Sequence, residues 1–131
     1  MTEAYENRDS LRSDLLKRLS KYCGYRGMGR DGVPYGMGDE LKFFGEDVDY
    51  SCRPKYYDVT VSGDDITIEW ECQEYLETPA GDTFEAARDM LLTTLDEHCK
   101  YLVEGRNVKI VITDRDGEGE PLVIVNGEEV G

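Results

Sequence analysis

The side chains that could do chemistry in this sequence are mostly carboxylates, and one group of them falls on a predicted β-hairpin. Residues 56–61 and 66–72 each alternate apolar and polar side chains, and Ser62-Gly63-Asp64-Asp65 between them suits a two-residue type II′ turn. In the register that this turn sets, Val59 faces Ile68, so the large apolar side chains share one face. The sequence therefore predicts a hairpin with one buried face and one exposed face.

Carboxylates lie on the exposed face of this predicted hairpin with no base between them. The register puts Asp58 opposite Glu69, and like charges opposed across a strand pair destabilise it by about 0.2–1 kcal/mol. We interpret this face as a docking surface for a basic partner; the alternative is an ordinary solvated face whose repulsion is screened by salt. The candidate partner-binding residues are Asp58, Glu69, Glu71 and Glu74.

A glycine-rich segment at 24–38 carries a second candidate site. Its Gly27, Gly29 and Gly32 match a G-x-G-x-x-G pattern, but a dinucleotide site needs this pattern between a strand and a helix, and here it follows a predicted helix. Aromatic and basic side chains of the segment could still hold a small anionic ligand by stacking and paired hydrogen bonds, with an irregular surface loop as the alternative. The candidate ligand-binding residues are Tyr25, Arg26, Arg30 and Tyr35.

A third group of carboxylates alternates with glycines between two predicted strands near the end of the chain. Carboxylates at this spacing can coordinate calcium, but the twelfth position of an EF-hand loop would here be Val125 instead of glutamate. A solvated acidic loop is the favoured interpretation, and no metal or other cofactor is expected. The weak calcium candidates are Asp114, Asp116, Glu118 and Glu120.

The sequence carries no recognisable catalytic signature. His98 is the only histidine and adjoins Cys99, but neighbouring helical residues point about 100° apart and so do not form a nucleophile–base pair. No nucleophile elbow, P-loop or metalloprotease pattern occurs. The four cysteines form no C-x-x-C pair and are expected to be reduced thiols in or near the core. We therefore expect a protein that is not an enzyme.

Two helices are predicted to support these sites. Apolar side chains at three- and four-residue spacing predict a helix over residues 3–23 that ends at Gly24. Asp82 and Glu85 form a capping-box pair that predicts a second helix reaching about Glu104.

The remaining strands complete the predicted fold. Residues 108–113 and 122–125 are expected to form a second hairpin, and residues 41–44 a weak edge strand. The predicted fold class is α+β, with two helices packed on one face of a mainly antiparallel sheet built from two hairpins, in the order α-(β)-β-β-α-β-β. All 131 residues are expected to form a single acidic domain.

Charge is the dominant global property of the chain. Asp and Glu number 29 against 15 Lys and Arg, which gives a net charge of −14. Such a field repels phosphate backbones and anionic membranes and attracts basic surfaces, so direct nucleic-acid and membrane binding are disfavoured. The sequence lacks a long apolar run and a signal-peptide pattern at its start, which predicts a cytoplasmic location. Salt adaptation is an alternative source of the acidity.

These observations favour a non-catalytic module that binds a basic protein, such as a nucleic-acid-processing enzyme, by placing carboxylates where phosphates would lie. In size and acidity the chain resembles small phage-encoded inhibitors of restriction or CRISPR systems, which implies an anti-defence role. One alternative is a small-ligand or nucleotide binder, or sponge, that uses the glycine-rich segment across a homodimer. Another is an acidic chaperone or a virion component.

Overall fold

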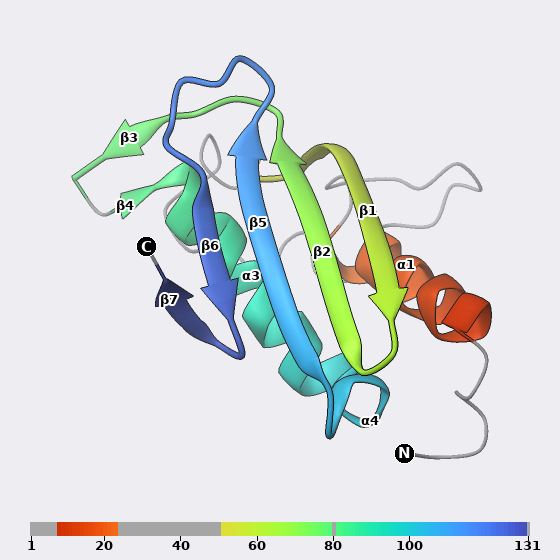
Figure 1. Ribbon diagram of the computed structural model, residues 1–131. Helices are drawn as coiled ribbons and strands as arrows, with labels where there is room; N and C mark the ends of the chain where they lie inside the picture. The colour runs from red at the N-terminus through yellow and green to blue at the C-terminus, as the bar shows by residue number, and fades with distance from the viewer. Residues whose placement is uncertain (1–7, 24–50, 80, 131) are drawn as a thin grey trace.

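The computed structural model describes residues 8–23, 51–79 and 81–130, which form a sheet with helices on one side (Figure 1). The predicted strand at 41–44 and the glycine-rich segment with its candidate residues Tyr25, Arg26, Arg30 and Tyr35 lie outside these ranges. The described elements are α1 (Arg8–Cys23), β1 (Pro54–Ser62), β2 (Asp65–Cys72), β3 (Glu77–Thr78), β4 (Gly81–Asp82), α3 (Thr83–His98), α4 (Lys100–Val103), β5 (Asn107–Asp114), β6 (Leu122–Val125) and β7 (Glu128–Val130).

Five strands form the main sheet in the order β1-β2-β5-β6-β7, and β3 and β4 form a separate short pair. All neighbours in the main sheet are antiparallel except β2 and β5, which are parallel. This parallel pair follows from the connection between its strands, because a crossover through α3 returns the chain to its starting edge. The predicted α+β class with a mainly antiparallel sheet is confirmed.

The first hairpin forms in the predicted register. Val59 pairs with Ile68 and Asp58 pairs with Glu69. Gly63 has φ +62 at the first central position of the turn, as a type II′ turn requires. Apolar side chains of β1 and β2 therefore enter the core together, and Trp70 is almost fully buried, with its Nε1 donating to the Cys52 carbonyl oxygen at 2.8 Å.

The two helices pack on the same side of the sheet as these apolar residues. In α1, Leu11, Leu15 and Leu19 are fully buried, and this helix contacts β1 and α3. The capping box predicted for α3 is present: Asp82 accepts from the Glu85 backbone N–H, and Glu85 accepts from that of Asp82. The prediction of a single helix that reaches about Glu104 is wrong in one respect. The observed helix is interrupted at Cys99 and continues as the short α4.

The second hairpin is longer than predicted. Strands β5 and β6 pair as expected, with Ile110 opposite Ile124. The chain then turns again at Asn126-Gly127, where φ values of 50° and 87° match a type I′ turn, and β7 adds an edge strand.

Cysteines are part of the hydrophobic core. All four are free and buried. Burial raises the pKa of the Cys23 thiol to about 12 and that of the Cys99 thiol to about 11. The prediction that the cysteines lie in or near the core is confirmed. Within the described ranges, none of the helices is long and apolar enough to cross a membrane.

Candidate functional site: an acidic cleft at one end of the sheet

The predicted acidic face of the first hairpin is partly neutralised. Asp58 and Glu69 lie opposite each other as predicted, but the Arg12 guanidinium of α1 donates to Asp58 Oδ1 at 2.5 Å and to the Val59 carbonyl oxygen at 2.7 Å. Lys109, opposite Thr67 on β2, adds a second cation to the same face. The expectation of carboxylates without a neighbouring base is therefore wrong at Asp58, because the base comes from a helix 46 residues away in sequence.

The remaining predicted carboxylates are placed differently. Glu69 and Glu74 are exposed, and Glu71 is half-buried on the same face as Glu69. Glu74 lies beyond the end of β2, next to Tyr75, and so belongs to the end of the sheet more than to its face.

The calcium candidates do not converge. Asp114 is buried and its carboxylate accepts backbone N–H groups, while Asp116, Glu118 and Glu120 are exposed. In the part of the chain that the structure describes, no group of three or more His, Cys, Asp or Glu side chains is placed to hold a metal ion. His98 stacks on Tyr22, with ring centroids 3.7 Å apart, which gives it a structural contact.

A larger concentration of carboxylates lies where β2 and β5 end. Because these strands are parallel, the segments that follow them leave the sheet at the same end, where α3 also begins. Together with the start of β6 and with β7 they enclose a cleft of about 710 Å³, which we call the acidic cleft. Its lining includes six carboxylates and no Lys or Arg among the described residues. The carboxylates are those of Glu77, Asp82, Glu85, Glu118, Glu120 and Glu129.

Asp114 holds the loop that carries two of these carboxylates. This side chain lies at the end of β5, and its Oδ2 accepts the backbone N–H groups of Asp116 at 3.2 Å and Glu118 at 3.1 Å. Its Oδ1 accepts the N–H of Gly119 at 3.0 Å. Burial alone would raise the pKa of Asp114, but these N–H donors outweigh it and lower the pKa below its usual value. The ionised carboxylate thus fixes the loop.

Gly119 lets this loop pack directly on an aromatic pair. The rings of Tyr75 and Phe84 meet edge to face, with centroids 4.9 Å apart. A Cβ at position 119 would lie 2.7 Å from Phe84 Cε2 and 2.9 Å from Tyr75 Cδ1, closer than side-chain carbons approach. The flanking Glu118 and Glu120 are therefore held at the edge of an aromatic surface.

Three of the six carboxylates already have structural partners. Asp82 and Glu85 form the capping box, and Asp82 Oδ2 also accepts the Tyr75 hydroxyl at 3.2 Å. Burial, with the charge of Asp82 next, raises the pKa of Tyr75 to about 12, so this phenol stays protonated. Glu129 accepts from Arg88 Nη1 at 2.6 Å.

The other three carboxylates of the acidic cleft, Glu77, Glu118 and Glu120, are exposed and make no ion pair with any described residue. Unpaired carboxylates beside an aromatic surface suit a guanidinium, which can stack on a ring while donating to carboxylate oxygens. The arrangement can bind cations, and arginine in particular.

The acidic cleft was not predicted, although two signals in the sequence indicate it. A strand at 65–72, a helix from 83 and a strand at 107–114 form a β-α-β pattern, which normally pairs its strands in parallel. Carboxylates are frequent in the segments after both strands. Together these signals predict an acidic end of the sheet.

Comparisons of the chain with protein-family models, with curated proteins and with solved structures give no match.

Proposed function

We propose that this protein is a non-catalytic binding module, active in the cytoplasm, that uses the acidic cleft to occupy a basic site on a partner protein. The partner is a protein whose basic groove ordinarily holds nucleic acid, such as a nucleic-acid-processing enzyme. A phage-type anti-defence inhibitor would act in this way.

One observation carries this proposal: Glu77, Glu118 and Glu120 lie together at the acidic cleft without an ion pair to any residue of 8–23, 51–79 or 81–130, and the buried Asp114 holds the loop that bears two of them. Because the backbone of the loop is already held, binding orders only the side chains of Glu118 and Glu120, which reduces the entropy cost of association. The net charge of −14 also speeds encounter with a basic surface.

The spacing of charge on a fixed loop is what distinguishes a phosphate mimic from a merely acidic protein. The Asp114 carboxylate ties three backbone N–H groups of the loop to the end of β5, those of Asp116, Glu118 and Gly119. The backbone that carries Glu118 and Glu120 therefore cannot rearrange freely. A partner that binds phosphates at fixed positions would recognise this loop by shape as well as by charge.

The experiment uses two variants of equal net charge. In E118Q/E120Q two carboxylates of the acidic cleft are neutralised, and in E97Q/E104Q two exposed carboxylates near the other end of α3 are neutralised. Wild type and both variants are immobilised, exposed to lysate of the source organism at low ionic strength, and eluted with a salt gradient. We expect a basic protein that elutes at clearly lower salt from E118Q/E120Q than from E97Q/E104Q, and that added duplex DNA displaces from wild type.

Two results would contradict the proposal. The bound proteins would elute at the same salt from all three columns if only overall charge mattered. Duplex DNA would fail to displace the partner if the acidic cleft did not occupy its nucleic-acid site.

A further inference from the structure

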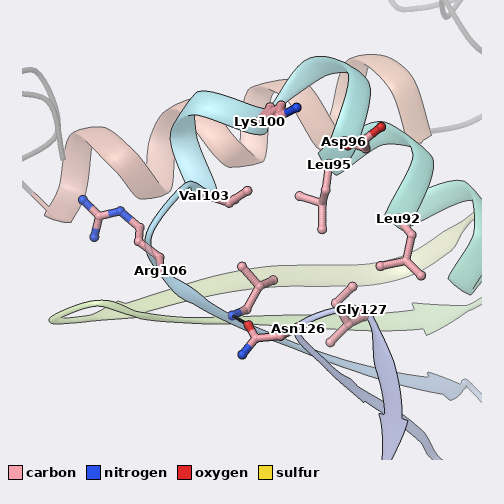
Figure 2. Close-up of a pocket in the computed structure, with 10 residues that line it drawn as sticks. Leu92, Leu95, Asp96, Lys100, Val103, Arg106, Asn126 and Gly127 are labelled. Atoms are coloured by element: carbon pink, nitrogen blue, oxygen red, sulfur yellow. Dashed lines mark hydrogen bonds between the residues drawn. The ribbon is translucent and has the colours of Figure 1, made fainter.

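A second cavity, of about 320 Å³, lies between the C-terminal half of α3, α4, β5 and the turn that joins β6 to β7 (Figure 2). In Figure 2 the side chains of Leu92 and Val103 point toward its interior, whereas that of Arg106 points away. Arg106 Nη1 donates instead to the Gly63 carbonyl oxygen at 3.3 Å. The apolar part of the lining consists of Leu92, Leu95, Val103, Val108 and Ile110.

This apolar cavity and the acidic cleft lie along the same pair of elements. The helix α3 contributes Glu85 to the acidic cleft and Leu92 to the apolar cavity. The hairpin β6–β7 contributes Glu129 to the acidic cleft and Gly127 to the apolar cavity. Between them the ion pair of Arg88 with Glu129 joins α3 to β7. The two cavities are therefore neighbours along α3 and β6–β7, separated by this ion pair.

We propose that the apolar cavity receives a leucine-sized side chain of the same basic partner whose cations enter the acidic cleft. The recognised segment then carries arginine or lysine at one end and an aliphatic side chain at the other. This inference rests on the proposed function, because it assigns a second contact to the same partner.

The charge of the acidic cleft indicates a basic partner, and the apolar cavity supplies the affinity that exposed ion pairs do not. Exposed ion pairs steer association but add little affinity, since water and salt screen them. Affinity in protein interfaces comes mainly from a few apolar or aromatic side chains buried in pockets. The apolar cavity, which lies next to the acidic cleft along α3, is the place for such an anchor.

Strand β6 sets the distance between the two contacts. Glu120 precedes Ile124, which pairs with the cavity residue Ile110, by four residues, and it precedes the cavity residue Asn126 by six, which at about 3.3 Å per extended residue corresponds to about 13–20 Å. A bound extended peptide has the same rise per residue, so about four to six residues separate the cation from the apolar anchor. The inference thus predicts a spacing as well as a composition.

The test measures fluorescence anisotropy of three synthetic peptides at low ionic strength. The first carries two arginines, a four-residue Gly-Ser spacer and leucine; the second has alanine for leucine; the third has leucine directly beside the arginines. We expect wild type to bind the first about fivefold to tenfold more tightly than the second, from partial burial of one leucine. The third should bind like the second.

Two variants check that the apolar cavity is responsible. Val103→Phe fills the cavity with apolar volume, and Leu92→Asn makes it polar; both positions are half-buried, and urea unfolding verifies that each variant folds. Both should lose the preference for the leucine peptide while binding the alanine peptide as wild type does. Tyr56→Ala, at an exposed aromatic residue on β1, is the control and should keep the preference.

The outcomes separate this inference from the proposed function. Equal binding of the first two peptides by wild type, or a preference that persists in Val103→Phe, overturns the inference. If E118Q/E120Q then still weakens binding of both peptides, the proposed function stands without it. If no peptide binds wild type, or if E118Q/E120Q binds them as wild type does, both fail.

Discussion

Replacing Asp114 with asparagine tests the claim that an ionised carboxylate holds the loop of the acidic cleft. Asparagine keeps the shape of the side chain and one acceptor oxygen, which can serve the N–H groups of Asp116 and Glu118. Its amide group then faces the N–H of Gly119, which loses its acceptor. Losing one hydrogen bond to a charged group costs about 1.5–3 kcal/mol, and the other two weaken. We expect Asp114→Asn to lower the free energy of unfolding by about 2–3 kcal/mol at neutral pH.

The pH dependence of this loss identifies its cause. The pKa of Asp114 is lower in the folded protein than its usual value, so its ionised form stabilises the fold above the unfolded pKa of about 3.9. That contribution disappears as the pH falls through the folded pKa, because the protonated acid resembles the amide. The difference between wild type and Asp114→Asn should therefore be full at neutral pH and shrink below about pH 4.

Urea unfolding followed by tryptophan fluorescence measures both quantities. Trp70 is the only tryptophan and is buried, so its emission reports loss of the core. Asp116→Asn, an exposed carboxylate in the same loop, is the control and should change stability by less than about 0.5 kcal/mol. A loss below about 0.5 kcal/mol for Asp114→Asn, or a loss that stays the same at acidic pH, would refute the reasoning.

Two further predictions concern packing. Gly119→Ala should destabilise the protein by about 1–3 kcal/mol, because the added Cβ meets the Phe84 ring. The control, Glu118→Ala at an exposed position, should change stability by less than about 0.5 kcal/mol. Urea unfolding compares the two variants, and equal effects would contradict the close contact at Gly119. The four buried cysteines should react with an aromatic disulfide reagent at mildly alkaline pH only after denaturation, since burial raises the pKa of Cys23 to about 12. Rapid reaction of the folded protein would show that the core opens.

Local signals in the sequence predicted the parts of the fold that depend on neighbouring residues. The turn at Gly63 fixed the register of the first hairpin, and the reciprocal hydrogen bonds of Asp82 and Glu85 fixed the start of α3. Strand β7 was missed although Asn126-Gly127 is a strong local turn signal, because the strand after it has only three residues.

Features that depend on distant residues were not predicted. The base next to Asp58 comes from Arg12, which a pattern confined to the hairpin does not contain. The acidic cleft exists because β2 and β5 are parallel neighbours, and this pairing joins residues about forty positions apart. The strand order therefore assigns the candidate partner-binding surface to the end of the sheet, whereas the sequence predicted it on the face of the first hairpin.

The way Asp114 holds its loop affects how this surface can change. Its partners are backbone N–H groups, which every residue except proline possesses, so the loop conformation does not depend on the side chains at positions 116 and 118. Apart from Gly117, whose φ of +68 favours glycine, and Gly119, whose missing Cβ the packing requires, residues at the tip can be exchanged without rebuilding the scaffold. Selection can thus retune which partner is recognised, one side chain at a time, at little cost to folding.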